Sequence, residues 1–232
     1  MPILNLSLFW FIVFISQLFL LSIISNKLFS RIYLFLHRIF KKDTTVVFVV
    51  SLVFLPGTFI HELCHAVAAT FLGSRVTAFS VWPRIEGDTI KMGYAEVEVL
   101  DIFRNSLIGT APLIIGTIIL YYLSSTFQNA DLVFKIIYLY LIFQISNSMF
   151  LSPADIKEVR VLFFVTLFIL ITAYITNFFF HKLNFLPQDF SFLKSDFYLD
   201  KLKIINFFLM FPVVANLSLL LIARYFITHK RY

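Results

Sequence analysis

The chain of 232 residues is poor in charged residues and has a single cysteine, Cys64. Charged residues form 14% of the sequence, whereas soluble domains carry about 25%. One cysteine excludes an intrachain disulfide. Neither an internal repeat nor a low-complexity linker interrupts the sequence, and 60% of its residues are hydrophobic. These features exclude a soluble globular protein and indicate one integral membrane domain over residues 1–232.

Basic residues outnumber acidic residues by 19 to 13, which gives a formal net charge of +6. In a membrane protein such an excess indicates contact with anionic lipid headgroups rather than with nucleic acid. The positions of the Lys and Arg residues leave the membrane orientation open, because the two sides of a six-span topology would carry ten and nine of them.

Long apolar stretches dominate the sequence, and each is close to the ~20 residues needed to cross the hydrocarbon core of a bilayer. The first is too long for the apolar core of a signal peptide and no Lys or Arg precedes it, so we expect it to be retained as a span. The sequence therefore predicts an all-α transmembrane fold, a polytopic bundle of about six helices in a cell membrane that we expect to be prokaryotic. The predicted spans cover about residues 3–25, 46–72, 105–127, 132–152, 159–180 and 204–226.

A basic amphipathic segment separates the first two predicted spans. In residues 27–42 the basic side chains fall within a sector of about 100° on a helical wheel, and Leu, Ile and Phe dominate the rest. A helix of this kind lies in the plane of the membrane interface. We therefore predict a separate interfacial helix over residues 27–42 that contacts anionic lipid. The basic residues of the sector are Lys27, Arg31, Arg38, Lys41 and Lys42.

Residues 75–99 differ in composition from the apolar stretches around them. Residues 76–82 and 89–99 are rich in Val, Ile, Thr, Tyr and Phe, which are typical of strands. Gly87 and Asp88 lie between the two runs and are suited to a tight turn. The pattern predicts a small β-hairpin directly after the second span. A polar loop with an alternating pattern is the other interpretation.

The sequence His61-Glu62-Leu63-Cys64-His65 lies inside the second predicted span. Charged groups at this depth cost about 2.5–3.5 kcal/mol each, so they are rare there without a function. Residues four apart share one face of a helix, so His61 and His65 can bind one zinc ion. Glu62 is then placed to accept a proton from a water that the metal activates. Two hydrogen-bonded histidines in a helical bundle are the other interpretation.

Pro56 and Gly57 lie about one turn before His61. Proline and glycine interrupt or loosen the hydrogen bonds of a helix, so we predict a kink at this point. Such a kink would give water access to the histidines, and a purely structural kink is the alternative.

Catalytic zinc usually has three protein ligands and one open position, so the two histidines need a third partner. The other three histidines of the chain lie in the basic segment or after the fifth and sixth spans. A carboxylate is therefore the better candidate. Asp155 follows Pro153, which should end the fourth helix and let Asp155 turn inward, although a helix-capping role is the alternative. Asp101 is a weaker candidate, and Cys64 is not expected to bind because a fourth protein ligand would close the site.

Two places in the sequence resemble a known family. Residues 61–65 match an HExxH motif on a transmembrane helix, and Asn147 and Asp155 are eight residues apart. Both features are similar to the site-2 protease family of intramembrane zinc metalloproteases, whose NxxPxxxLDG motif has an Asn and a metal-binding Asp at this spacing. A hairpin after the HExxH helix is a further family trait. Pro153 and Ile156 depart from the motif, so the chain resembles a divergent member over roughly residues 55–158.

The resemblance implies a ligand set and a mechanism. One zinc ion would be held by His61, His65 and Asp155, with Glu62 as the general base that later protonates the leaving amine. Asn147 would donate a hydrogen bond to the oxyanion of the scissile peptide, or would form an interhelical hydrogen bond instead. The substrates would be membrane-anchored proteins, unwound and bound as an added strand at the hairpin.

Two other functions fit parts of the pattern. A catalytically silent relative would keep the metal site and act as a binding partner or as a component of a transporter. A membrane zinc peptidase of the prenyl-protein endopeptidase class would need a Glu ligand near another His on a later helix, and Glu158 has no such neighbour. Loss of cleavage on substitution of Glu62 by Gln would separate the protease from the silent relative.

Overall fold

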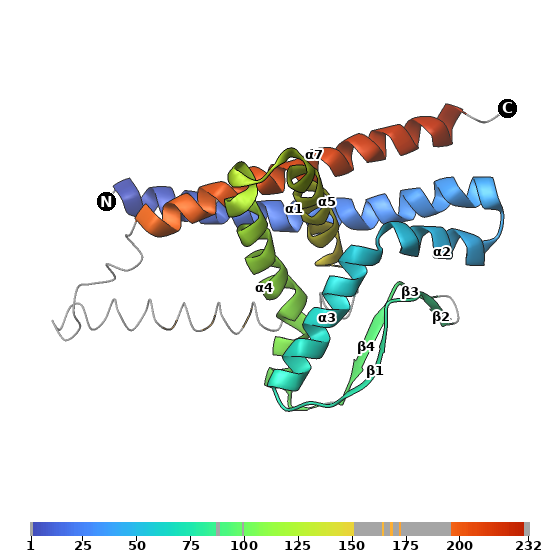
Figure 1. Ribbon diagram of the computed structural model, residues 1–232, viewed down its shortest axis with the longest axis horizontal. Coiled ribbons are helices and arrows are strands. Elements are labelled where there is room, and N and C mark those ends of the chain that lie inside the picture. The colour runs from blue at the N-terminus through green and yellow to red at the C-terminus, as the bar shows by residue number, and fades with distance from the viewer. Residues whose placement is uncertain are drawn as a thin grey trace.

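A computed structural model describes residues 2–86, 89–98, 100–150, 164, 168, 172 and 196–229 of the chain. This part is mostly helical with one small antiparallel hairpin, which confirms the predicted helical class and the hairpin (Figure 1). The helices are α1 (Pro2–Phe40), α2 (Asp43–Val53), α3 (Leu55–Phe71), α4 (Ile102–Thr126), η1 (Phe127–Asn129), α5 (Leu132–Ser148) and α7 (Asp196–His229). The strands are β1 (Val76–Ser80), β2 (Arg84–Glu86), β3 (Thr89–Lys91) and β4 (Tyr94–Val97).

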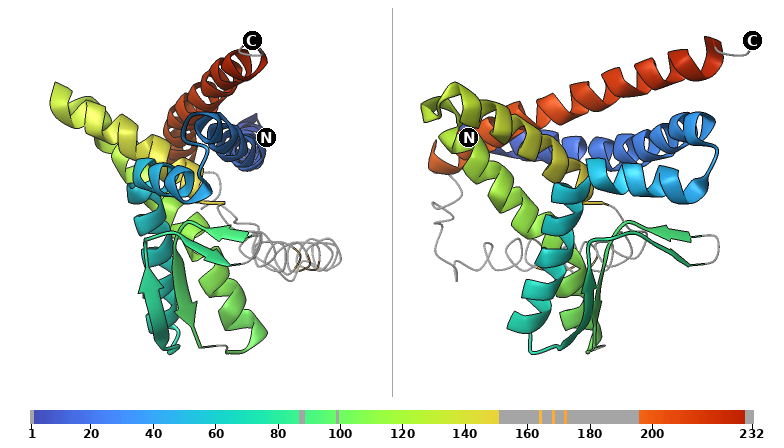
Figure 2. Two further views of the ribbon diagram at one scale, coloured as in Figure 1. Left: turned by 90° about the vertical axis from the view of Figure 1, so that its right-hand side faces the viewer. Right: turned by 45° about the vertical axis from the view of Figure 1, so that its right-hand side comes forward.

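The two long helices α1 and α7 lie side by side and run in the same direction (Figures 1 and 2). The amide of Gln17 in α1 donates to the carbonyl of Asn206 in α7 at 3.2 Å. The side chain of Asn206 donates in turn to the carbonyl of Trp10 at 3.0 Å. Both side chains are buried, and these bonds pair their amide N–H groups with carbonyls of the neighbouring helix.

The basic segment continues α1 without a break. It is helical, as predicted, but it is not a separate helix after the first span. The helix contains no Gly and, after its first residue, no Pro, so nothing in it ends the helix at the expected point. Phe29 and Ile32 pack against the buried Val46 and Val50 of α2. Packing against a neighbouring helix, which the charge pattern does not reveal, therefore sets the path of this segment.

A break at Phe54 separates α2 from α3, and the two helices are bent by 77°. Pro56 lies in the first turn of α3, where its missing N–H cannot bond the carbonyl of Leu52. Gly57 lets α3 approach α5 closely, because a Cβ atom there would lie 2.7 Å from the carbonyl oxygen of Gln144. The predicted kink at Pro56 and Gly57 is confirmed.

The hairpin consists of two paired parts. Strand β1 pairs antiparallel with β4, with Phe79 opposite Ala95, and β2 pairs antiparallel with β3. Pro83 lies between the two parts and cannot donate to a strand ladder, which accounts for the interruption. The turn residues that connect β2 to β3 lie outside the described part of the chain. Strands β1 and β4 pack on α3, the helix that carries the two histidines.

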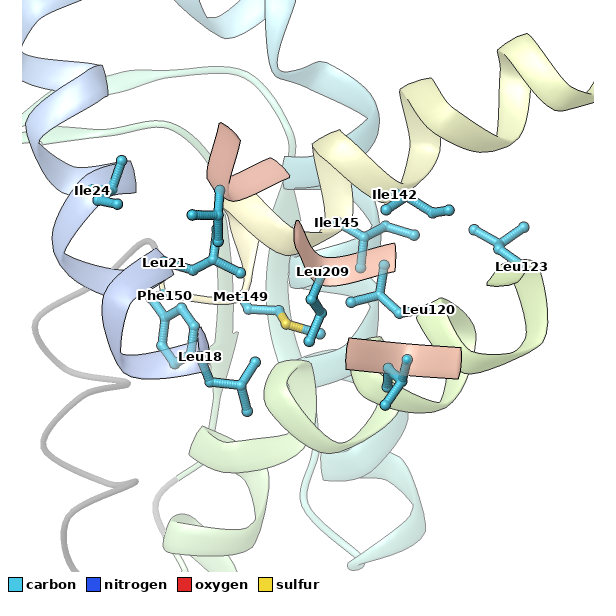
Figure 3. Close-up of a cluster of buried hydrophobic side chains, with 12 residues drawn as sticks. Leu18, Leu21, Ile24, Leu120, Leu123, Ile142, Ile145, Met149, Phe150 and Leu209 are labelled. Atoms are coloured by element: carbon cyan, nitrogen blue, oxygen red, sulfur yellow. The ribbon is translucent and has the colours of Figure 1, made fainter. Parts of the chain in front are cut away.

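An apolar core forms where α1, α4, α5 and α7 meet (Figure 3). Gly116 of α4 makes room for Met149, because a Cβ atom at Gly116 would lie 2.7 Å from the Cε atom of Met149. The core holds α4 and α5 in place, and both of these helices pack against α3. The buried residues of the core are Leu18, Leu21, Ile24, Leu120, Leu123, Ile142, Ile145, Met149, Phe150, Ile205, Leu209 and Val213.

Three described helical segments are long and apolar enough to cross a membrane: Phe9–Phe40, Ile102–Asn129 and Leu199–Phe226. They correspond to the first, third and sixth predicted spans and indicate a membrane protein. The bent pair of α2 and α3 would be a fourth crossing if it forms one span. Helix α5 has 17 residues, which is short of the ~20 that a straight crossing needs. The predicted fifth span, 159–180, lies almost entirely outside the described residues.

Candidate metal centre

His61 and His65 lie one turn apart on the same face of α3, as their spacing predicts. Their side chains are 3% and 9% exposed, and Glu62 is 8% exposed. The two Nε2 atoms are 3.1 Å apart and the ring planes are inclined by 82°. For zinc–nitrogen distances of about 2.0–2.1 Å, this separation corresponds to an N–Zn–N angle of roughly 100°, close to the tetrahedral value. The histidine pair therefore fits one zinc ion.

The backbone carbonyl of Ile108 in α4 fixes the tautomer of His65. Its oxygen atom lies 2.9 Å from Nδ1 of His65. A carbonyl oxygen only accepts, so the Nδ1–H group donates, and Nε2 of the neutral ring keeps its lone pair. Histidines that bind metals are usually oriented by such a bond from their other nitrogen. Nε2 of His65 is therefore an electron-pair donor, either to a metal or to a hydrogen bond from His61.

Glu62 lies where the chain entering β4 meets α3. A Cβ atom on Gly93 would lie 3.1 Å from Cγ of Glu62 and 2.7 Å from Cγ2 of Thr58. Only glycine lets the backbone pass so close to the helix. The hairpin therefore adjoins the carboxylate that is predicted to be catalytic. An isolated glycine beside a strand pattern is the sequence signal for such an approach, and it was not used in the sequence-based prediction.

The predicted third ligand, Asp155, lies outside the described residues, as does Glu158. Within the described part of the chain, no group of three His, Cys, Asp or Glu side chains is placed to hold one metal ion. The weaker candidate Asp101 has a structural role: it caps α4 by accepting from the backbone N–H of Arg104 at 2.9 Å, and it forms an ion pair with the Arg104 guanidinium at 3.1 Å. Cys64 is a buried free thiol. His61 and His65 are thus the two ligand candidates that the described structure brings together.

Asn147 is 1% exposed and forms hydrogen bonds to three helices. Its Nδ2 atom donates to the carbonyl of Phe143 in α5 at 2.8 Å, and its Oδ1 atom accepts from Asn216 in α7 at 2.7 Å. Its backbone carbonyl accepts from the hydroxyl of Ser25 in α1 at 3.0 Å. Asn147 therefore forms interhelical hydrogen bonds, which was the alternative interpretation of this residue from the sequence. A catalytic role for Asn147 stays a prediction.

Asn216 was not identified from the sequence as a partner of this region. It is fully buried in α7 and binds the predicted oxyanion donor directly. The sequence signal for such a residue is an uncharged amide inside an apolar span, because polar side chains at such positions usually form hydrogen bonds across helices. The sequence does not reveal the partner, since 69 residues separate the two asparagines.

A groove with a volume of about 540 Å³ lies between α1, α2 and the residue that precedes Gly93. Met92 forms part of its wall, so the groove reaches the same stretch of chain that covers Glu62. Most of its lining side chains are apolar, and Asn26, Ser30 and Tyr33 add an amide and two hydroxyl groups. The apolar lining residues are Phe29, Leu34, Val47, Val50 and Met92.

No protein family, curated protein or solved structure matches the chain. Its function is therefore inferred from the chemistry and geometry of the residues described above.

Proposed function

We propose that the protein is an intramembrane zinc metalloprotease, similar to the site-2 protease family, that hydrolyses peptide bonds of membrane-anchored proteins. The observation that carries this proposal is the 3.1 Å separation between the Nε2 atoms of His61 and His65 on a buried helix turn. Glu62, which is also buried, follows His61 in the same turn. Ionisable groups gathered inside an apolar membrane protein mark a functional site by default.

The zinc ion would be held by His61, His65 and Asp155. The hydrogen bond from Nδ1 of His65 to Ile108 supports this role, because it leaves Nε2 free of a proton. Zinc, when bound, acts as a Lewis acid that lowers the pKa of water towards ~7 and so provides a nucleophile at neutral pH.

Glu62 would act as the general base and then as the general acid. Its carboxylate takes a proton from the attacking water and passes it to the amine that leaves. Asn147 would donate to the developing oxyanion through the second hydrogen of its Nδ2 group, because the first is directed to Phe143.

A helical substrate must unwind before water can reach its peptide bond, since its carbonyls and N–H groups are paired within the helix. Strands β1 and β4 form a two-stranded sheet against α3, and a substrate segment would be added to it as a further strand. The close approach of Gly93 to Glu62 supports this route, because a segment bound along the sheet passes near the carboxylate.

The proposal includes a multi-pass topology in a prokaryotic cell membrane, with the basic part of α1 at anionic lipid. Because α1 and α7 run in the same direction (Figure 1), the number of crossings counted from α1 to α7 is odd if both cross the membrane, rather than the six predicted from the sequence. The five basic side chains between residues 27 and 42 are exposed, which supports that contact.

A cleavage experiment tests the proposal. The wild-type protein, Glu62→Gln and a control acid-to-amide change, Asp131→Asn at the exposed start of α5, are each co-expressed with a panel of tagged single-span membrane proteins. We expect at least one panel member to be cleaved by the wild type and by Asp131→Asn, and not by Glu62→Gln. Cleavage that survives in Glu62→Gln would contradict the proposed mechanism.

The zinc content of the purified protein tests the ligand set. We expect about one zinc per chain in the wild type and in the control variant His37→Ala, and a large loss in His61→Ala and Asp155→Ala. Full zinc content and activity in Asp155→Ala would place the third ligand elsewhere. Another outcome is that the wild type binds one zinc per chain through His61 and still cleaves no panel member. That result would favour the catalytically silent alternative.

A further inference from the structure

Helix α4 contains a proline, Pro112, in its interior. Proline has no backbone N–H, so the carbonyl four residues earlier loses its partner within the helix, and the proline ring also crowds that carbonyl and pushes it outward. The carbonyl four residues before Pro112 belongs to Ile108. It is the group that accepts the Nδ1–H of His65 at 2.9 Å.

The freed carbonyl needs a donor because it lies in a buried, apolar setting. Ile108 is 4% exposed and Pro112 is buried as well. An unpaired backbone carbonyl inside a membrane protein is unfavourable, because no water is present to replace the lost hydrogen bond. His65 supplies the missing donor, and in doing so its ring keeps the proton on Nδ1 and directs the lone pair of Nε2 towards His61.

One contact links the start of α4 to the end of α3, and a second pair of bonds fixes the start of α4. The guanidinium of Arg104 donates to the carbonyl of Leu72, just after the end of α3, at 3.3 Å. The side chain of Asn105 both accepts from and donates to the backbone of Leu100, at 3.0 and 3.1 Å, and so fixes the start of α4. These anchors hold the Ile108 carbonyl opposite His65.

We propose that Pro112 is a positioning residue of the metal centre: by freeing the Ile108 carbonyl, it selects the Nδ1–H tautomer of His65 and presents Nε2 as a ligand. The effect on the tautomer is independent of the proposed function, whereas the effect on zinc affinity rests on it.

The tautomer is measured in metal-free protein by ¹⁵N-labelling the histidines and recording long-range ¹H–¹⁵N correlation spectra in micelles, with His65 assigned by its loss in His65→Gln. We expect the wild type to show a protonated Nδ1 and an unprotonated Nε2. In Pro112→Ala, the new backbone N–H competes for the Ile108 carbonyl, and we expect the Nε2–H tautomer of His65 to become populated. The control is Pro212→Ala, which changes the buried proline inside α7 and leaves the His65 spectrum unchanged.

Zinc affinity is measured on the same variants by competition with a chromophoric chelator. Loss of an outer-shell partner of a metal-binding histidine typically weakens binding by about 10–100-fold. We expect a loss of this size in Pro112→Ala and a change of less than about twofold in Pro212→Ala. Circular dichroism and size-exclusion profiles check that both variants fold. Pro112→Gly, which also restores an N–H at position 112, replaces Pro112→Ala if that variant is misfolded.

The proposal is overturned if Pro112→Ala and Pro112→Gly keep the wild-type tautomer of His65, or if Pro212→Ala changes it to the same extent. A different result would separate the two proposals: the wild type binds no zinc, and the His65 tautomer changes when Pro112 is replaced but not when Pro212 is replaced. That result would contradict the proposed function and support the role of Pro112.

Discussion

The side-chain amide of Asn216 in α7 donates a hydrogen bond of 2.7 Å to Oδ1 of Asn147 in α5, and neither side chain is more than 1% exposed. This contact uses the acceptor of Asn147, while one hydrogen of its Nδ2 atom is directed to Phe143. The orientation of the Asn147 amide is therefore determined from two sides. A substrate oxyanion that binds the Asn147 side chain must therefore accept the second hydrogen of Nδ2.

Replacing Asn216 by Leu should destabilise the protein by leaving Oδ1 of Asn147 buried without its donor. Hydrogen bonds between membrane helices contribute about 0.6 kcal/mol on average and up to ~1.7 kcal/mol. A double-mutant cycle with Asn147→Leu, read out by unfolding in micelles, should give a coupling energy in this range. Zinc affinity should not change in Asn216→Leu, since the residue is not a ligand. Strictly additive effects in the cycle would show that the bond contributes nothing.

The Gly93→Ala substitution should reduce cleavage while zinc binding is retained. The new Cβ atom would lie 2.7 Å from Cγ2 of Thr58 and 3.1 Å from Cγ of Glu62, so the strand or the carboxylate must move. Displacement of a catalytic group by about 1 Å can cost up to ~100-fold in rate. We expect kcat for a cleaved panel substrate to fall by about tenfold or more. The double variant Gly93→Ala with Thr58→Ser, which removes the nearest methyl group, should recover part of the activity; no recovery would exclude this steric cause.

The local part of the site could be predicted from the sequence. The spacing of His61 and His65 follows from the helical period alone, and the structure places their Nε2 atoms 3.1 Å apart. The hairpin was predicted from the residue types of its strands and from its turn residues, Gly87 and Asp88. The kink after α2 was predicted from Pro56 and Gly57. Each of these features depends on residues that are neighbours in the sequence.

The features that the sequence did not reveal depend on contacts between distant segments. The carbonyl of Ile108 and the amide of Asn216 have no local pattern that names His65 or Asn147 as their partners. The basic segment after residue 26 was predicted to form a separate helix, because its charges share one face. The structure continues α1 through this segment, and Phe29 on its apolar side packs on α2.

Gly57→Ala should weaken the packing of α3 on α5. The added Cβ atom would lie 2.7 Å from the carbonyl oxygen of Gln144, which is backbone and cannot rotate away. Overpacking of this kind typically costs about 1–3 kcal/mol. Gly116→Ala is the matched control, because its nearest contact, also at 2.7 Å, is the flexible end of Met149. Thermal unfolding in micelles should show a larger loss for Gly57→Ala, and equal losses would contradict the role assigned to the Gln144 carbonyl.

Removal of zinc should lower the stability of the wild-type protein and leave that of His61→Ala unaffected. A ligand that binds only the folded state stabilises it by about 2.7 kcal/mol at a free concentration of 100 times its Kd. The apparent Tm of the wild type should therefore rise when zinc is added to chelator-treated protein. His61→Ala should show no such rise, because one of the two nitrogens that lie 3.1 Å apart is lost. His37→Ala serves as the control, since His37 lies at the end of α1 and pairs with Asp43 at 3.0 Å. An equal rise in Tm for His61→Ala would mean that the stabilising zinc binds elsewhere on the chain.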